Sequence, residues 1–319
     1  MSSRARPART DGPKGNFFLV GAPKAGTTSV ERLLRELPDV FLSPIKEPCH
    51  FCPDVAEQLA PSFRRKQQVD VASYLASAER PPVGLAWVAS PDDYARLYEG
   101  ADGHKVVGEC STFYLSSKVA ARRIRDYNPD AKIVAVLRRP LDRIRSHYEM
   151  DRVHGTTRES LPELVERELA LGEDANWGNS HYYVGASRYE SQLREFRRHF
   201  PAANLCVLSF EQILADPARE LSRLFAFLGI DPPEGAARLP SANRGRAARF
   251  PAFNSALHES GYKSIVSGAL KRVLPRRLER AAKEAYYRRG ARMVPDRDLA
   301  RVQALLREAG VEESMAIAG

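Results

Sequence analysis

Short apolar segments alternate along the chain with segments in which apolar residues recur every three or four positions. The short segments predict buried strands, and the periodic ones predict amphipathic helices. The predicted strands are 17–20, 40–42, 105–109, 132–137 and 205–208. The first predicted helix opens after residue 26 and ends at Pro38, the second spans 116–127, and the third begins at Pro140. A fourth helix is opened by a capping box from Ser187 to Glu190, and a fifth is capped by Asp216 and stopped by Gly229. Strands that alternate with helices favour an α/β fold with a parallel sheet and ligands at the carboxyl ends of its strands.

A glycine-rich loop joins the first strand to the first helix. Gly21 and Gly26 stand in a G-x-x-x-x-G-T-T pattern, close to that of a nucleotide-binding P-loop. Amide groups of such a loop turn toward one point, where the helix dipole also favours an anion. Thr27 occupies the usual place of the P-loop lysine, and Lys24 lies inside the loop instead. A lysine there can sit beside a bridging oxygen at the mouth of the loop and stabilise it as it leaves.

A second candidate anion site follows the strand 132–137. Arg138-Arg139-Pro140 comes directly after this strand, and Pro140 suits the first turn of a helix. Ser146 lies about 9 Å along that helix and shares a face with Arg143 and Asp142. A guanidinium at the strand end and a hydroxyl on the next helix suit a phosphate monoester.

These two motifs carry a family resemblance. Pro-Lys-x-Gly-Thr-Thr resembles the 5′-phosphosulfate loop of sulfotransferases that use 3′-phosphoadenosine 5′-phosphosulfate (PAPS), and the segment from Leu137 to Tyr148 resembles their 3′-phosphate site. The resemblance implies a P-loop-like parallel sheet flanked by helices, PAPS as co-substrate and no metal. It implies that a hydroxyl or amine of a small-molecule or carbohydrate acceptor attacks the sulfur in line. The implied donor-binding residues are Lys24, Ala25, Gly26, Thr27, Thr28, Ser29, Arg138 and Ser146.

The segment Lys46-Glu47-Pro48-Cys49-His50-Phe51 is similar to the Lys-Glu-Pro-His-Phe-Phe segment of bacterial and heparan-type sulfotransferases, with Cys49 additional or substituted. This similarity implies Glu47 as the general base, with His50 lining the acceptor side. His50 is the alternative base, because its ordinary pKa is near neutral. A different interpretation is that Glu47 pairs with a nearby lysine or arginine and only shapes the pocket.

The resemblance extends over residues 16–255 and divides the chain. Residues 1–15 are expected to form a disordered basic tail, 16–255 the sulfotransferase domain, and 256–319 a helical C-terminal extension that covers the active site or a dimer partner. Arg244, Gly245 and Arg246 are similar to the basic loop that closes over PAPS, although an ordinary basic loop fits equally well. Loops 52–104 and 153–186 are expected to form the acceptor pocket, whose chemistry the sequence leaves open.

Charge and composition narrow the class of partner. The formal net charge is +9, which suits an anionic cofactor and acceptor, and no nucleic-acid-binding motif is present. No apolar run approaches the ~18 residues of a membrane span, and no export signal precedes the loop, so a cytoplasmic location is expected. Cys49 and Cys52 have zinc or redox spacing, but buried thiols are favoured because no second pair follows. The alternative enzyme class is a P-loop kinase that acts on a small molecule. Such a kinase needs a Walker-B-like carboxylate at the end of a strand, but the strand 132–137 is followed by Arg138.

Overall fold

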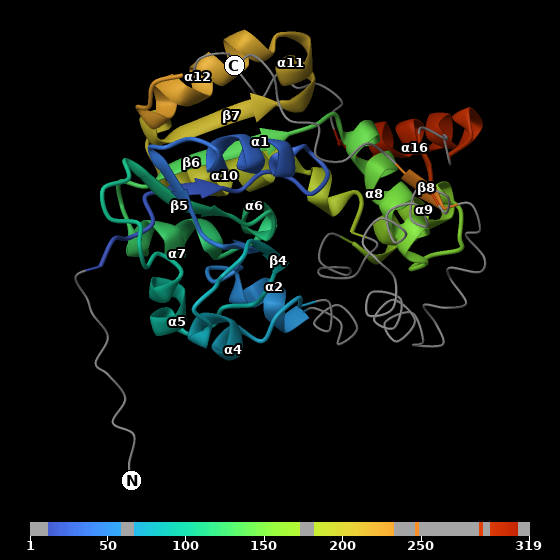
Figure 1. Cartoon of the computed structure of the whole chain (residues 1–319). Coiled ribbons are helices and arrows are strands. Elements are labelled where there is room, and N and C mark those ends of the chain that lie inside the picture. The colour runs from blue at the N-terminus through green and yellow to red at the C-terminus, as the bar shows by residue number, and fades with distance from the viewer. Residues whose placement is uncertain are drawn as a thin grey trace. The chain divides into compact units, whose positions relative to one another are not determined.

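The computed structural model describes residues 12–58, 67–172, 182–232, 246–248, 287–289 and 294–311. The chain falls into two units (Figure 1). The first comprises residues 1–138, 189–240 and 316–319, and the second comprises residues 139–188 and 241–315. Among the described residues, no helix has both the length and the apolar character needed to cross a bilayer.

A five-stranded parallel sheet forms the centre of the first unit. Its strand order is β2 (Val40–Leu42), β5 (Val106–Cys110), β1 (Phe17–Leu19), β6 (Lys132–Leu137) and β7 (Leu205–Ser209). Nearly every residue of these strands is buried, as expected for a parallel sheet covered by helices. The flanking helices include α1 (Thr27–Arg35), α7 (Ala120–Tyr127), α10 (Tyr189–His199), α11 (Phe210–Ala215) and α12 (Pro217–Leu228). The predicted α/β class and all five predicted strands are confirmed.

A small second sheet in the same unit pairs β3 (Ile45–Glu47) with β4 (Val83–Leu85) in parallel. The short helices α2 (Pro53–Gln58), α4 (Val71–Ala76), α5 (Pro91–Arg96) and α6 (Phe113–Ser116) accompany it in the chain. Backbone hydrogen bonds from Ala86 to Glu47 (3.2 Å) and from Val88 to Pro48 (2.9 Å) extend the pairing past the strand ends. The segment that follows β3 is therefore held in place along its backbone.

Two predicted helix starts differ from the observed ones. The helix predicted over 116–127 begins only at Ala120, as α7, because residue 116 ends α6 and the Ser117 hydroxyl accepts hydrogen bonds from Val119 N (3.2 Å) and Ala120 N (3.0 Å) before α7 starts. The predicted capping box at Ser187 is wrong. The helix begins at Tyr189, and the Ser187 hydroxyl instead accepts from Arg143 Nε at 2.7 Å.

The second unit contains α8 (Pro140–His154), α9 (Leu161–Leu171), a 3₁₀ turn at Gly185–Ser187, and α16 (Asp296–Glu308). Its apolar core joins these three helices through Ile144, Leu164, Val165, Val302 and Leu306. The antiparallel strands β8 (Arg246–Ala248) and β9 (Tyr287–Arg289) belong to the same unit, so residues 287–289 of the predicted helical extension are extended. The remainder of that extension, apart from 294–311, lies outside the described residues.

A buried carboxylate stands at the end of β5. Glu109 is 1% exposed and accepts hydrogen bonds from the hydroxyls of Tyr94 (2.8 Å), Tyr114 (2.7 Å) and Ser111 (2.5 Å). Ser111 Oγ also accepts from the backbone N of Cys49 at 3.2 Å. Burial raises the pKa of Glu109 from 4.5 to about 7, although the three hydroxyl donors act in the opposite direction. The group therefore holds a proton in mildly acidic solution that the unfolded chain has released.

We expect the Glu109→Gln variant to change the pH dependence of stability. A folded-state pKa above the unfolded value means that the contribution of Glu109 is fully present below the unfolded value and is lost as the pH rises through the folded value. The free energy of unfolding of the wild type, relative to that of the variant, should fall by about 3 kcal/mol as the pH rises from below the unfolded value to above the folded value. Urea denaturation across this range measures the difference. The exposed Glu36→Gln variant is the control, and a wild-type-to-Glu109→Gln difference that is constant with pH would contradict the assignment.

Candidate functional site

The loop between β1 and α1 is shaped by close contact with β6. Val20 N donates to Val134 O (2.8 Å) and Ala22 N donates to Val136 O (2.9 Å), so the chain continues the sheet before it turns. A side chain at Gly21 would overlap the backbone of Val136, which explains the glycine there. The loop thus leaves the sheet with its backbone tightly held.

The second half of this loop has the conformation of an anion site. Lys24 (φ 70°) and Gly26 (φ 93°) both adopt the left-handed conformation. Among the described residues no side chain caps α1, and its first turn holds no acidic residue. The first amides of α1 therefore point out of the helix, and the helix dipole adds to their attraction for an anion. Thr27 is buried at the base of the loop, while Thr28 is half-buried.

Arg138 extends this positive region from the end of β6. Its Nη1 donates to the carbonyl oxygen of Lys24 at 3.2 Å, and its guanidinium lies 5.3 Å from the ring centroid of Phe210. A side chain at Gly26 would overlap the same ring. Tyr189 fixes the backbone of Arg138 by donating to its carbonyl oxygen at 2.8 Å. The predicted residues Lys24, Gly26 and Arg138 are thus brought together within the first unit.

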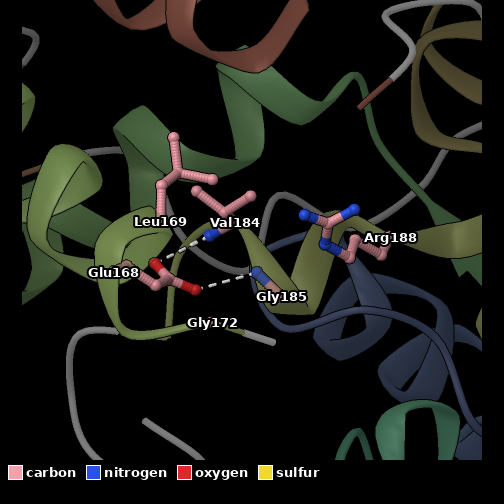
Figure 2. A pocket seen from close by; sticks show the side chains of 6 residues that line it. All are labelled: Glu168, Leu169, Gly172, Val184, Gly185 and Arg188. Atoms are coloured by element: carbon pink, nitrogen blue, oxygen red, sulfur yellow. Dashed lines mark hydrogen bonds between the residues drawn. The ribbon is translucent and has the colours of Figure 1, made fainter. Parts of the chain in front are cut away.

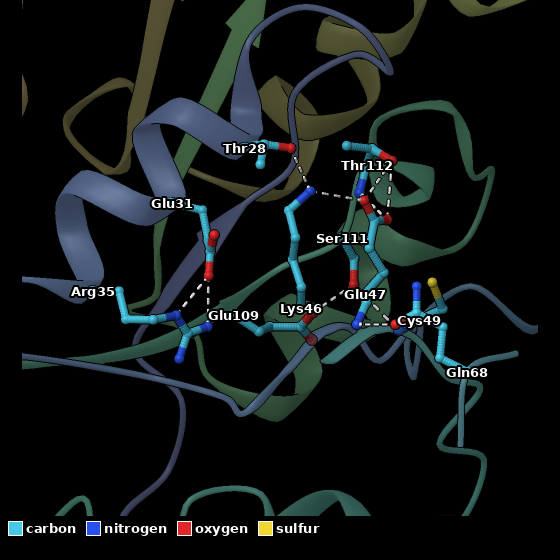
Figure 3. A network of polar contacts seen from close by, with 11 residues as sticks. Thr28, Glu31, Arg35, Lys46, Glu47, Cys49, Gln68, Glu109, Ser111 and Thr112 are labelled. Atoms are coloured by element: carbon cyan, nitrogen blue, oxygen red, sulfur yellow. Dashed lines mark hydrogen bonds and ion pairs between the residues drawn. The ribbon is translucent and has the colours of Figure 1, made fainter. Parts of the chain in front are cut away.

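Glu47 lies at the end of β3, where its carboxylate has three identified partners. Thr112 donates to Oε2 from both its backbone N and its hydroxyl, each at 3.0 Å. Lys46 Nζ lies 3.5 Å from Oε1 and donates to the Thr28 hydroxyl at 2.9 Å (Figure 3). The ion pair expected in the alternative interpretation of Glu47 is present, with Lys46 as the partner. Through Lys46 it connects Glu47 to Thr28, at the start of α1. The sequence analysis assigned no role to Lys46, which begins the recognised segment 46–51, or to Thr112, which follows the strand predicted at 105–109.

His50 has a different set of contacts. Its Nδ1 lies 2.7 Å from the carbonyl oxygen of Val88, which can only accept, so Nδ1 carries the proton. The ring stacks on Tyr94 at a centroid distance of 4.2 Å. Burial lowers the pKa of His50, the Val88 carbonyl opposes this, and Arg123 lowers it further. Cys49 takes a left-handed conformation (φ 52°) between Glu47 and His50, as an additional residue in the segment would.

The basic cluster at 138–145 is largely paired within itself. Arg139 and Arg145 contact Asp142 at 2.8 and 3.0 Å. Arg143 is completely buried in the second unit and donates to Ser187 Oγ and Tyr183 O. Ser146 lies half-buried on α8 of that unit. Arg244 and Gly245 lie outside the described residues, and Arg246 begins β8.

A pocket in the second unit is lined by Glu168, Leu169, Gly172, Val184, Gly185 and Arg188 (Figure 2). The Glu168 carboxylate accepts backbone hydrogen bonds from Tyr183 (2.8 Å), Val184 (2.9 Å) and Gly185 (2.8 Å). None of the predicted donor-binding or base residues lines this pocket, although five of its six lining residues lie in the segment 153–186 that was expected to form part of the acceptor pocket. Its carboxylate serves to order the chain that leads to the 3₁₀ turn.

The four cysteines are all buried and free of disulfides. Burial raises the pKa of the Cys49 and Cys52 thiols, which disfavours the thiolate needed for redox or metal chemistry. Within the described part of the chain, no cluster of three or more His, Cys, Asp or Glu side chains could hold a metal ion.

Comparison with known proteins agrees with this arrangement. A model of the sulfotransferase family matches residues 16–234. Heparan sulfate glucosamine 3-O-sulfotransferase 3A1 of Mus musculus is 31% identical over 148 residues, which are 46% of this chain and 35% of that protein. Bifunctional heparan sulfate N-deacetylase/N-sulfotransferase 2 of Homo sapiens is 25% identical over 223 residues, 68% of this chain and 22% of that protein.

The matched regions therefore span less than half the length of these relatives. Among solved structures, a sulfotransferase from Alicyclobacillus acidocaldarius superposes with a TM-score of 0.59 and 28% identity, covering 78% of this chain and 95% of that one. The family match covers well over half of the chain and includes the loop, Glu47 and Arg138. The chain belongs to the sulfotransferase family.

Proposed function

We propose that the protein transfers a sulfuryl group from PAPS to a hydroxyl group of a carbohydrate acceptor. The observation that carries this proposal is the loop at the end of β1, in which Lys24 lies inside the turn and Arg138 donates to the carbonyl oxygen of Lys24. A lysine in this place, together with the uncapped start of α1, fits a phosphosulfate better than a nucleoside triphosphate. The family match supports the same conclusion.

The residues of the loop fit the 5′ end of PAPS. Lys24 and the segment 25–29 would hold the phosphosulfate, since the described residues place no acidic side chain in the first turn of α1 and leave its amides uncapped. Arg138, at the end of β6, would hold the 3′-phosphate. When bound, PAPS supplies an activated sulfuryl group whose leaving group is adenosine 3′,5′-bisphosphate (PAP).

The chemistry required of the chain is positioning, proton removal and charge stabilisation. The acceptor oxygen forms a bond to sulfur, while the bond from sulfur to the bridging phosphate oxygen breaks. Glu47 takes the proton of the acceptor hydroxyl, and Thr112 keeps its carboxylate in a fixed orientation. Lys24 stabilises the negative charge that develops on the bridging oxygen. No step requires a metal ligand from the chain.

The choice of a carbohydrate acceptor rests on the relatives and on charge. The curated relatives are named for action on heparan sulfate, an acidic polysaccharide. The net charge of +9 favours an anionic acceptor, because opposite charges accelerate encounter. A phenol or an amine acceptor is the competing outcome of the assay below.

Nucleotide binding and sulfuryl transfer test the proposal directly. We expect PAP to bind more tightly than ADP in calorimetry, without Mg²⁺, because only PAP carries the 3′-phosphate. Arg138→Ala should weaken PAP binding by about 2–5 kcal/mol, the usual loss for one partner of a buried charge pair. The exposed neighbour Arg139→Ala is the matched control. Equal affinity for ADP, or an absolute need for Mg²⁺, would contradict the proposal. Transfer of label from PAPS to p-nitrophenol but not to heparan sulfate would show that the acceptor is a phenol and not a carbohydrate.

Lys24→Ala tests the role of the loop lysine. Because the charge on the bridging oxygen develops in the transition state, the variant should lose about 10²–10³ in kcat. Steady-state kinetics with radiolabelled PAPS measure this loss, and the exposed Lys14→Ala variant is the control. An increase in KM at unchanged kcat would instead show that Lys24 contributes only ground-state binding.

The identity of the base is tested by comparing Glu47→Gln with His50→Ala. We expect the first variant to lose about 10²–10⁴ in kcat, the usual contribution of a general base, and to bind PAP normally. His50→Ala should retain most of its turnover, because the protonated Nδ1 of His50 is committed to Val88. Loss of turnover in the histidine variant alone, with PAP binding intact in both, would transfer the role of base to His50.

A further inference from the structure

Lys46 connects two parts of the site that are far apart in the sequence. Its ammonium donates to the Thr28 hydroxyl at 2.9 Å and lies 3.5 Å from Glu47 Oε1 (Figure 3). Thr28 belongs to the first turn of α1, next to the donor loop, and Glu47 is the proposed base. The Lys46 side chain is only 20% exposed, so these contacts are shielded from bulk water.

The fold does not need Lys46 to hold α1 and β3 together. Arg35 of α1 donates to the carbonyl oxygens of Leu42 (3.1 Å) and Ser43 (2.9 Å), which lead into β3. Glu31 fixes the Arg35 guanidinium at 2.6 Å (Figure 3). A separate ion pair therefore holds the backbone between β2 and β3 against α1, and the Lys46 ammonium acts on side chains of the site.

The chemistry of an ammonium decides the direction of its bond to Thr28. Lys46 can only donate, so Thr28 Oγ1 accepts from it. The hydroxyl hydrogen of Thr28 is then directed to a different partner, and an anionic oxygen in the loop is the strongest acceptor that can be offered there. The positive charge of Lys46 adds to the field of the α1 terminus in the same direction.

Titratable groups on three elements act on Lys46. They are Glu31 of α1, Glu47 of β3 and Cys110 of β5. Burial lowers the pKa of Lys46, but Cys110, Glu47 and Glu31 outweigh it and raise the pKa above its ordinary value. Lys46 is therefore cationic throughout the neutral range.

We propose that Lys46 is a positioning residue of the donor site. It holds the Thr28 hydroxyl so that this group donates to the 5′-phosphosulfate, and it ties that hydroxyl to the Glu47 carboxylate. This inference rests on the proposed function, since it requires that PAPS occupies the loop.

A double-mutant cycle on PAPS binding tests the inference without an acceptor. The variants are Lys46→Met, Thr28→Val and the combination of both, and calorimetry measures the affinity of each for PAPS. Lys46→Met and Thr28→Val should each weaken PAPS binding about tenfold, the scale of one hydrogen bond to a charged group. The double variant should lose less affinity than the product of the two single losses, because both substitutions remove the hydrogen bond from the Thr28 hydroxyl to the phosphosulfate.

Lys105→Met is the matched control, since Lys105 also pairs with a carboxylate, Asp39 at 2.8 Å, but is exposed. It should bind PAPS as the wild type does, and the unfolding midpoints should show that every variant is folded. Additive losses of PAPS affinity, or a Lys46→Met variant that binds PAPS as tightly as Lys105→Met does, would overturn the inference. If the wild type still binds PAPS, the proposed function is unaffected by that result. A wild type that binds neither PAPS nor PAP would overturn both.

Discussion

The position of β1 between β5 and β6 is the constraint on which the site depends. Leu19 is in register with Cys110 on one side and with Val134 on the other. Because all three strands are parallel, their carboxyl ends reach the same edge of the sheet. The donor loop, the turn at Ser111 and Arg138 follow these strand ends directly. Chain segments more than a hundred residues apart thus meet without any long connection between them.

The end of β5 shows how one short segment supplies both stability and geometry. Ser111 and Thr112 are adjacent, and their hydroxyls serve different partners, with Ser111 bonded to Glu109 and Thr112 to Glu47. The buried carboxylate is costly to ionise, and three hydroxyl donors offset part of that cost. The same segment therefore fixes a core group on one side and a carboxylate of the site on the other.

The second unit shows that a basic residue has no fixed role. Arg143 stands in the same basic run as Arg138, yet it is completely buried and binds the 3₁₀ turn through Ser187. Glu168 orders the preceding backbone by accepting three amide hydrogen bonds. These contacts give the second unit a polar interior beside its apolar core. A guanidinium that is completely buried within the unit is not exposed to an anion in solution.

The sequence by itself determined the fold class, all five strands of the main sheet and the segments that surround the site. Apolar periodicity and the placement of glycine and proline are local properties, so they can be read from neighbouring residues. The sequence did not reveal that Lys46 bridges Thr28 and Glu47, or that Ser187 binds Arg143 rather than capping a helix. A charged or hydroxyl side chain can satisfy several partners, and only the tertiary structure decides which of them lies within hydrogen-bond distance.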